Sequence, residues 1–109
     1  FLIVTPEYNH GYTAVLKNAL DYLETEWFRK PVAFVSYGGS TGGSRAVEQL
    51  RLVAIELKMV PVSTAVHLVR FKQELDEHGI PTNPVYGKTL EKLLADLVWY
   101  AQTLKAARK

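Results

Sequence analysis

Cysteine is absent from the 109-residue sequence, and this absence removes several classes of chemistry at once. Without thiols the chain can form no disulfide, no thiolate metal site and no cysteine nucleophile. Any catalytic or binding role must therefore come from oxygen, nitrogen and aromatic side chains, or from the backbone.

An excess of one charge and a long apolar run are also lacking. Lys and Arg number 13 against 11 Asp and Glu, and no run of five basic residues occurs, which disfavours a nucleic-acid partner. No apolar stretch approaches the roughly 18–20 residues that a membrane span needs, and no secretory signal is visible. We therefore expect a cytoplasmic protein with no nucleic-acid or membrane partner.

The apolar content of 48% is enough for one compact core, and its pattern alternates between short apolar runs and helical periodicity. This alternation predicts an α/β fold with a parallel sheet and covering helices. Pro61 should make the third strand short or irregular. A long polar loop is expected over 70–86. We expect strands at Phe1–Thr5, Val32–Ser36 and within Met59–Leu68, and helices from Thr13, as N-cap, to about Glu24, from Ser44 to Lys58 and from Gly87 to Ala107.

The chain opens directly on the apolar run Phe1–Val4, a pattern typical of a strand buried on both faces of a parallel sheet. Three strands are few for an open sheet of this kind. We therefore expect residues 1–109 to be a single domain that is incomplete at its N-terminal side, and the alternative is a mature chain that begins at Phe1.

Two unusual loops follow the first two predicted strands, PEYNHG from Pro6 and YGGSTGG from Tyr37. Ligands of open α/β sheets bind outside the carboxyl ends of the strands, so two such loops should open on the same edge. Glycines allow a ligand to approach the backbone closely, and a helix start adds free N–H groups. For either loop alone, ordinary turn chemistry is the competing interpretation. Considered together, they favour a binding site.

More familiar motifs do not fit these loops. Gly38, Gly39, Gly42 and Gly43 have neither Walker A nor G-x-G-x-x-G spacing. Ser40 lacks the G-x-S-x-G context of a nucleophile, and His10 has no partners at metal-ligand spacing. Glu7 could be a base, a helix cap or a solvated charge. We therefore predict neither a metal nor a catalytic dyad.

The segments TPEYN, LKNALDYL and KPVAFVSYGGSTGGSRAVEQLR together resemble the NAD(P)H-dependent FMN reductase family, whose fold is flavodoxin-like. The resemblance extends to the stretch Asp76–Pro81 and to the Trp-Tyr pair in the last helix. It implies a three-layer α/β sandwich in which the chain supplies strands three to five of the order 2-1-3-4-5.

The resemblance also implies that the two loops embrace the isoalloxazine ring of FMN. Hydride would pass from NADPH or NADH to the flavin and on to a small-molecule acceptor such as a flavin, quinone or azo compound. The protein would supply positioning and electrostatics, so no catalytic residue is predicted. The residues expected to contact FMN are Pro6, Glu7, Tyr8, Asn9, Tyr37, Gly38, Gly39, Ser40, Gly42 and Gly43.

One departure from the family leaves alternatives open. The Ser-, Thr- and Arg-rich loop that holds the FMN phosphate has no counterpart here, so the function is assigned to a parent protein. A flavodoxin-like electron carrier is one alternative, although such carriers are usually acidic and this chain has a pI of about 8.9. A non-catalytic interaction fragment that no longer binds FMN is the other. The family also implies a homodimer or homotetramer, with Tyr22, Leu23, Trp27 and Phe28 as candidate interface residues or as packing within the subunit.

Overall fold

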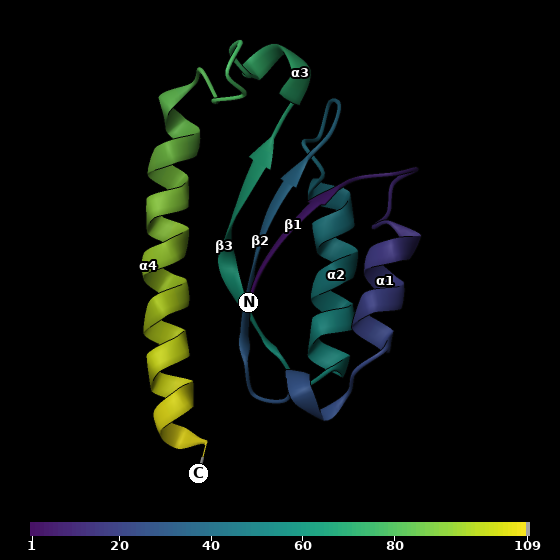
Figure 1. Cartoon of the computed structure of the whole chain (residues 1–109), viewed down its shortest axis with the longest axis vertical. Coiled ribbons are helices and arrows are strands. Elements are labelled where there is room, and N and C mark those ends of the chain that lie inside the picture. Colours follow the sequence, from purple (N-terminus) through teal and green to yellow (C-terminus); the bar gives the residue numbers. More distant parts are fainter. Residues whose placement is uncertain (109) are drawn as a thin grey trace.

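The computed structural model describes residues 1–108 and contains a three-stranded parallel sheet (Figure 1). The strands are β1 (Leu2–Pro6), β2 (Pro31–Tyr37) and β3 (Val60–Leu68), in the spatial order β1-β2-β3. Because every strand points the same way, all three carboxyl ends lie along one edge. The predicted α/β class with a parallel sheet is confirmed.

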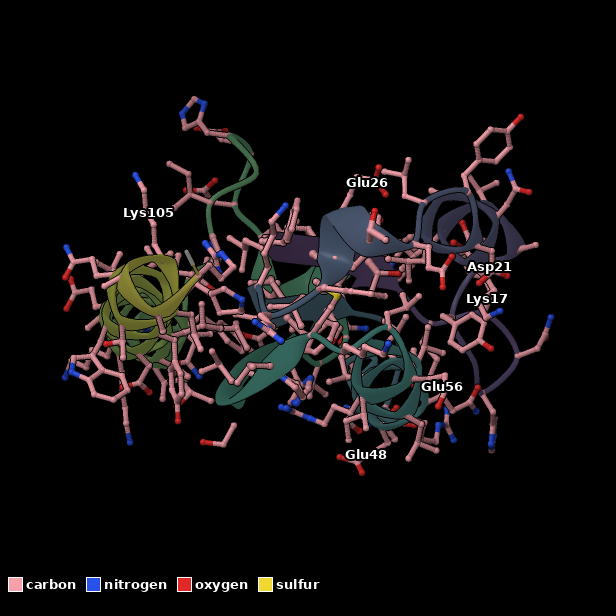
Figure 2. The ribbon with its side chains drawn as sticks, turned by 90° about the horizontal axis from the view of Figure 1, so that it is seen from below. Lys17, Asp21, Glu26, Glu48, Glu56 and Lys105 are labelled. Carbon is pink, nitrogen blue, oxygen red and sulfur yellow. The ribbon has the colours of Figure 1, made fainter. Side chains whose placement is uncertain are left out.

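Helices cover the sheet on both faces, which produces three layers (Figure 2). Helices α1 (Ala14–Asp21) and α2 (Ser44–Glu56) lie on one side, and α4 (Pro84–Ala107) lies on the other. Charged side chains such as Lys17, Glu48 and Lys105 point outward from these helices. None of the helices described within residues 1–108 combines the length and apolarity needed to cross a bilayer.

Strand β2 lies at the centre of the core, and its side chains point alternately toward the helices on the two faces of the sheet. Val32 and Phe34 pack with Leu50 of α2, whereas Ala33 packs with Leu93 of α4, and all are buried. This double burial explains why the sequence of β2 is almost continuously apolar.

Strand β1 does not match the expectation of a strand buried on both faces. Within residues 1–108 it pairs only with β2, and Leu2 and Val4 are 41% and 62% exposed. Helix α4 packs chiefly against β3 and β2, which leaves these two residues of β1 exposed. The apolar run therefore forms an exposed edge.

Helix boundaries follow capping groups. The Thr13 hydroxyl accepts a hydrogen bond from the Leu16 amide, which confirms the predicted N-cap of α1. Helix α1 ends at Asp21 rather than Glu24, because the indole of Trp27, in the 3₁₀ turn η1 (Thr25–Trp27), donates to the carbonyls of Leu20 and Leu23.

Two other predictions need correction. Helix α4 begins at Pro84 rather than Gly87, because Asn83 caps it and proline suits the first helical position. The predicted loop over 70–86 contains the short helix α3 (Phe71–Glu74). Strand β3 is nine residues long but irregular, since its register with β2 shifts close to Pro61.

Candidate functional site

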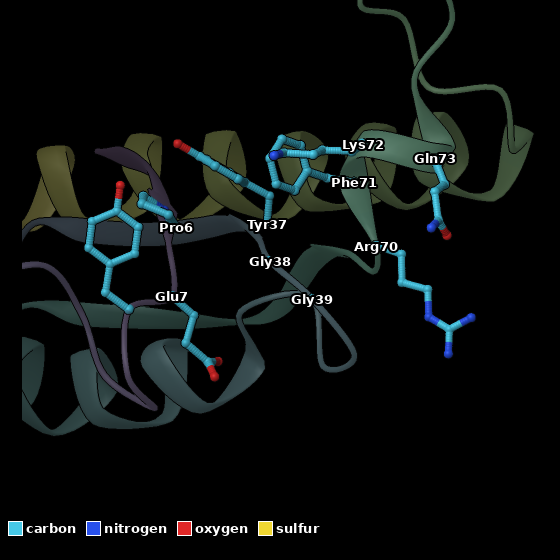
Figure 3. Close-up of a pocket in the computed structure, with 10 residues that line it drawn as sticks. Pro6, Glu7, Tyr37, Gly38, Gly39, Arg70, Phe71, Lys72 and Gln73 are labelled. Carbon is cyan, nitrogen blue, oxygen red and sulfur yellow. The ribbon is translucent and has the colours of Figure 1, made fainter.

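A cavity of about 470 Å³ opens at the carboxyl edge of the sheet (Figure 3). Its volume falls within the range of small-molecule and cofactor sites. Three chain segments contribute to its lining, one after each strand, which is the location that the sheet topology favours. The lining residues are Pro6, Glu7, Tyr8, Tyr37, Gly38, Gly39, Arg70, Phe71, Lys72 and Gln73.

The first segment ends in a tight hairpin turn. The amides and carbonyls of Tyr8 and Gly11 exchange two hydrogen bonds of 3.0 Å. Asn9 and His10 between them have φ values of 51° and 68°, as a type I′ turn requires. The turn places Pro6 to Tyr8 in the cavity wall, whereas Asn9 is exposed at the tip and does not line the cavity.

The carboxylate of Glu7 is turned away from the cavity and caps helix α2. It accepts hydrogen bonds from the Arg45 amide at 3.1 Å, the Ala46 amide at 3.4 Å and the Thr41 hydroxyl at 3.3 Å, and it pairs with the Arg45 guanidinium. Only 5% of the Glu7 side chain is exposed. Figure 3 shows the carboxylate directed away from Tyr37. Of the three roles open to Glu7, the structure shows the helix cap.

This environment sets the charge state of Glu7. Burial alone would raise the pKa of its carboxyl, but the hydrogen bonds and the charge of Arg45, with the Ala46 amide, together hold that pKa below its usual range. Glu7 is therefore an anion that neutralises Arg45 and the positive end of α2. Both carboxylate oxygens accept hydrogen bonds from Thr41, Arg45 or Ala46 and are turned from the cavity, which makes Glu7 unsuited to act as a base.

The glycine loop has a first arm, Gly38 and Gly39, and a second arm, Gly42 and Gly43, and the two have different surroundings. Gly38 and Gly39 line the cavity, and the amides of Gly39 and Ser40 donate to no group within residues 1–108. Gly42 and Gly43 instead lie buried against the ends of β2 and β3. The loop thus carries, on one arm, N–H groups without a partner among residues 1–108, and the other arm anchors it.

The anchored arm meets a polar pair beneath the loop. Ser36 is fully buried, and its hydroxyl lies 2.7 Å from both the Gly42 carbonyl and His67 Nδ1. Burial and the charge of Arg51 lower the pKa of His67, against an opposing effect of Glu48. His67 is therefore neutral at neutral pH.

The third wall of the cavity, Arg70 to Gln73, was not predicted. It is tied to the glycine loop, because the Arg70 amide donates to the Gly39 carbonyl at 2.8 Å and the Phe71 amide donates to the Gly38 carbonyl at 3.3 Å. The Phe71 ring also packs edge-on against Tyr37, with centroids 5.0 Å apart. The rule that identified the first two loops applies equally to the end of β3 and would have found this segment.

Comparison with known proteins places these segments in one family. The model of the NADPH-dependent FMN reductases matches residues 1–73, which include both predicted loops and the end of β3. The chain belongs to the NADPH-dependent FMN reductase family. Members that it resembles include an NAD(P)H-dependent FMN reductase of Schizosaccharomyces pombe, 50% identical over 74 residues (66% of this chain and 36% of that protein). Another, from Saccharomyces cerevisiae, is 42% identical over 98 residues (89% of this chain and 51% of that protein).

A solved structure supports the same fold. The flavoenzyme NAD(P)H:(acceptor) oxidoreductase FerB of Paracoccus denitrificans superposes with a TM-score of 0.64 at 24% sequence identity, over 96% of this chain and 60% of that one. The fold is flavodoxin-like, as the resemblance implied. The chain spans about a third to a half of the length of the two FMN reductases that it matches.

In this family member the site predicts a two-step loss of stability in acid. Because the folded-state pKa values of His67 and Glu7 are both lowered, the unfolded chain binds protons that the folded chain does not. The stability that these two groups contribute should be present above pH 6.5, fall as the pH drops from 6.5 to the lowered pKa of His67, and fall again from 4.5 toward the lowered pKa of Glu7.

Urea unfolding followed by circular dichroism between pH 3 and 8 measures both steps. The variant H67N should lose the upper step and E7Q the lower one. Stability that rises as the pH falls from 6.5 to 5 would contradict the assignment.

Proposed function

We propose that the protein to which this chain belongs is an FMN-dependent NAD(P)H oxidoreductase. It would transfer hydride from NADPH or NADH to FMN and reduce a flavin, quinone, azo compound or similar small acceptor. The observation that carries the proposal is the position of the cavity. Two of its three walls lie entirely within the segments that resemble the FMN reductases, and the family match extends through the third.

The residues present suit a flat, electron-accepting ring. Gly39 has no heavy atom within 4 Å of the place where a side chain would begin, so a planar ligand can approach this backbone closely. The Gly39 amide, which has no partner within residues 1–108, is available to the polar edge of the ring, and Pro6 and Tyr8 supply further lining. FMN, when bound, supplies the redox chemistry, and the chain orients the ring and stabilises negative charge at its edge.

All ten predicted FMN contacts remain part of this proposal, with different roles. Gly42, Gly43 and Ser40 support or extend the glycine loop rather than line the cavity, and Asn9 forms the hairpin tip. Residues 1–109 would form one partial flavodoxin-like domain, with the FMN phosphate held by another segment of the protein.

The function is tested on the purified full-length protein. We expect a yellow protein with a flavin absorbance band that oxidises NADPH or NADH in the steady state when a quinone is present. A yellow protein that does not oxidise either nicotinamide would instead support the electron carrier. A colourless protein that binds no added FMN would contradict the proposal and leave the non-catalytic interaction fragment as the better interpretation.

The charge at the cavity rim predicts a preference for NADPH. Arg70 and Lys72 are exposed lining residues, whereas the only acid in the lining, Glu7, is turned toward α2 and paired. An anionic substrate should be attracted to this rim, and NADPH carries one more phosphate than NADH. The variant K72E should raise the KM for NADPH about threefold to tenfold and the KM for NADH less, with little change in kcat.

The matched control for this charge reversal is K105E. Lys105 is in the last turn of α4, at the opposite end of the molecule from the carboxyl edge of the sheet (Figure 1), so K105E should leave both KM values unchanged. Equal effects of K72E on NADPH and NADH would contradict a role for the extra phosphate.

We further propose a cytoplasmic homodimer or homotetramer. Tyr22 and Leu23 are 82% and 43% exposed at the end of α1 and are available to a second copy. Trp27 packs instead on the Phe1 ring of its own chain, with centroids 4.9 Å apart, and Phe28 lies under the Lys58 ammonium. Sedimentation of the full-length protein and of Y22D would show whether the exposed pair contributes to assembly.

A further inference from the structure

The hydroxyl of Ser36 determines which ring nitrogen of His67 carries a proton. A serine hydroxyl has one proton to donate, and the Gly42 carbonyl, 2.7 Å away, can only accept. The Ser36 proton therefore goes to Gly42, and the hydroxyl oxygen must accept from His67 Nδ1, also at 2.7 Å. His67 is thus the Nδ1–H tautomer, with Nε2 unprotonated when the ring is neutral.

This pair orients the peptide between Gly42 and Gly43. Its carbonyl points toward Ser36, and in a trans peptide the N–H of Gly43 must then point the opposite way. The Gly43 nitrogen also lies close to Gly38, because a side chain added at Gly38 would begin 3.3 Å from it. Gly38 is itself a cavity residue. The buried peptide therefore lies directly beside a residue of the cavity wall.

The close packing of the anchored arm leaves little room for another arrangement. A side chain at Gly42 would begin 2.9 Å from the Val69 amide nitrogen, and one at Gly43 would begin 2.7 Å from Ser36 Cβ. Both glycines have positive φ, at 61° and 86°. Glycine adopts positive and negative φ about equally, so its own preference does not fix this conformation. The hydrogen bond from Ser36 to the Gly42 carbonyl ties this peptide to β2, in addition to the bonds from the Gly42 amide to the Gly39 carbonyl and from the Val47 amide to the Gly43 carbonyl.

We propose that Ser36 and His67 are positioning residues that fix the Gly42–Gly43 peptide and thereby hold the glycine loop in the shape of the flavin wall. This inference rests on the proposed function only for its consequence on FMN. The competing interpretation is that the pair merely satisfies a buried hydroxyl and contributes stability alone.

Two substitutions of His67 separate these interpretations. The amide nitrogen of asparagine is as many bonds from Cα as Nδ1, so H67N keeps a donor for Ser36, whereas the amide nitrogen of H67Q lies one bond farther out. S36A removes the hydroxyl itself. T64V is the control, because it removes a different hydrogen bond of β3, the 2.9 Å contact from the Thr64 hydroxyl to Asp96 of α4.

The experiment uses the full-length protein and begins without FMN. Nitrogen-15 NMR of the ring should show the Nδ1–H tautomer in the wild type. Hydrogen exchange at the Gly42, Ser44 and Arg70 amides, which close the loop, should become faster in S36A and H67Q but not in H67N or T64V. An Nε2–H tautomer, or unchanged exchange in both S36A and H67Q, would overturn the proposal.

FMN titration followed by flavin fluorescence then measures the consequence. The dissociation constant should rise about tenfold in S36A and H67Q. It should stay within about twofold of the wild-type value in H67N and T64V. Unchanged affinity in H67Q, with a wild type that binds FMN, would contradict the positioning role. If the wild type binds no FMN, the proposed function fails, and the tautomer and exchange measurements still decide whether the pair fixes the loop.

Discussion

Replacement of Gly43 by alanine is expected to lower the free energy of unfolding by about 3 kcal/mol and to weaken FMN binding with it. Gly43 has φ of 86°, where an alanine is strained, and the new Cβ would begin 2.7 Å from Ser36 Cβ and 2.9 Å from Ser36 Oγ. Ser36 is fully buried at the end of the central strand, so it cannot move aside cheaply.

Two other glycines divide this effect into its parts. Gly79 has φ of 76° but open space around it, so G79A should show the conformational strain alone, about 1 kcal/mol. Gly39 has neither a positive φ nor a neighbour within 4 Å, so G39A should be close to neutral for stability. Urea unfolding of the three variants should therefore rank G43A, G79A and G39A in that order of destabilisation.

The ranking tests whether steric contact with Ser36 matters. If G43A and G79A were equally destabilised, strain at positive φ would account for both, and the close packing of the loop on β2 would have no measurable energetic consequence. A stable G43A with unchanged FMN affinity would also remove the physical basis for treating Gly43 as part of the site.

The sequence predicted the sheet and the two main loops because these depend on local patterns. The apolar run of β2 and the helical periodicity of α2 need no long-range information, and the Thr13 cap was recognisable from one residue type. The same patterns could not show that β1 is exposed, since Phe1–Val4 is equally apolar at an edge and in a centre. Which helix packs on which strand depends on tertiary contacts, which a local sequence pattern does not contain.

The role of Glu7 shows the limit of prediction for the site. A carboxylate in a loop has the same sequence signature as a base, a cap or a solvated charge. Its contacts are made 34 to 39 residues farther along the chain, at Thr41, Arg45 and Ala46. No local motif links these positions, because N-caps are normally supplied by the residue just before the helix, which here is Gly43 and has no side chain. The hydrogen bond between Ser36 and His67 spans a comparable 31 residues.

The last expectation concerns Glu7 itself. E7Q should lower the free energy of unfolding by about 2–3 kcal/mol, because an amide keeps the shape but loses the charge that Arg45 and the start of α2 require. This loss of stability should lie at the lower end of the range for breaking a buried ion pair, because Arg45 is 42% exposed and water can solvate it. D21N is the control, because it makes the same chemical change in the exposed pair with Lys17 and should leave the urea midpoint unaltered.

E7Q also separates a structural carboxylate from a catalytic one. Glu7 lies between Pro6 and Tyr8 in the cavity wall, so the variant should bind FMN more weakly. With FMN saturating, kcat should remain close to the wild-type value, because the carboxylate is turned to α2 and none of its contacts reaches the cavity. A kcat that fell by a factor of about 100 or more under saturation would instead assign Glu7 to proton transfer. The retained turnover therefore decides between a wall held in place by a buried ion pair and a site that uses the same residue as a base.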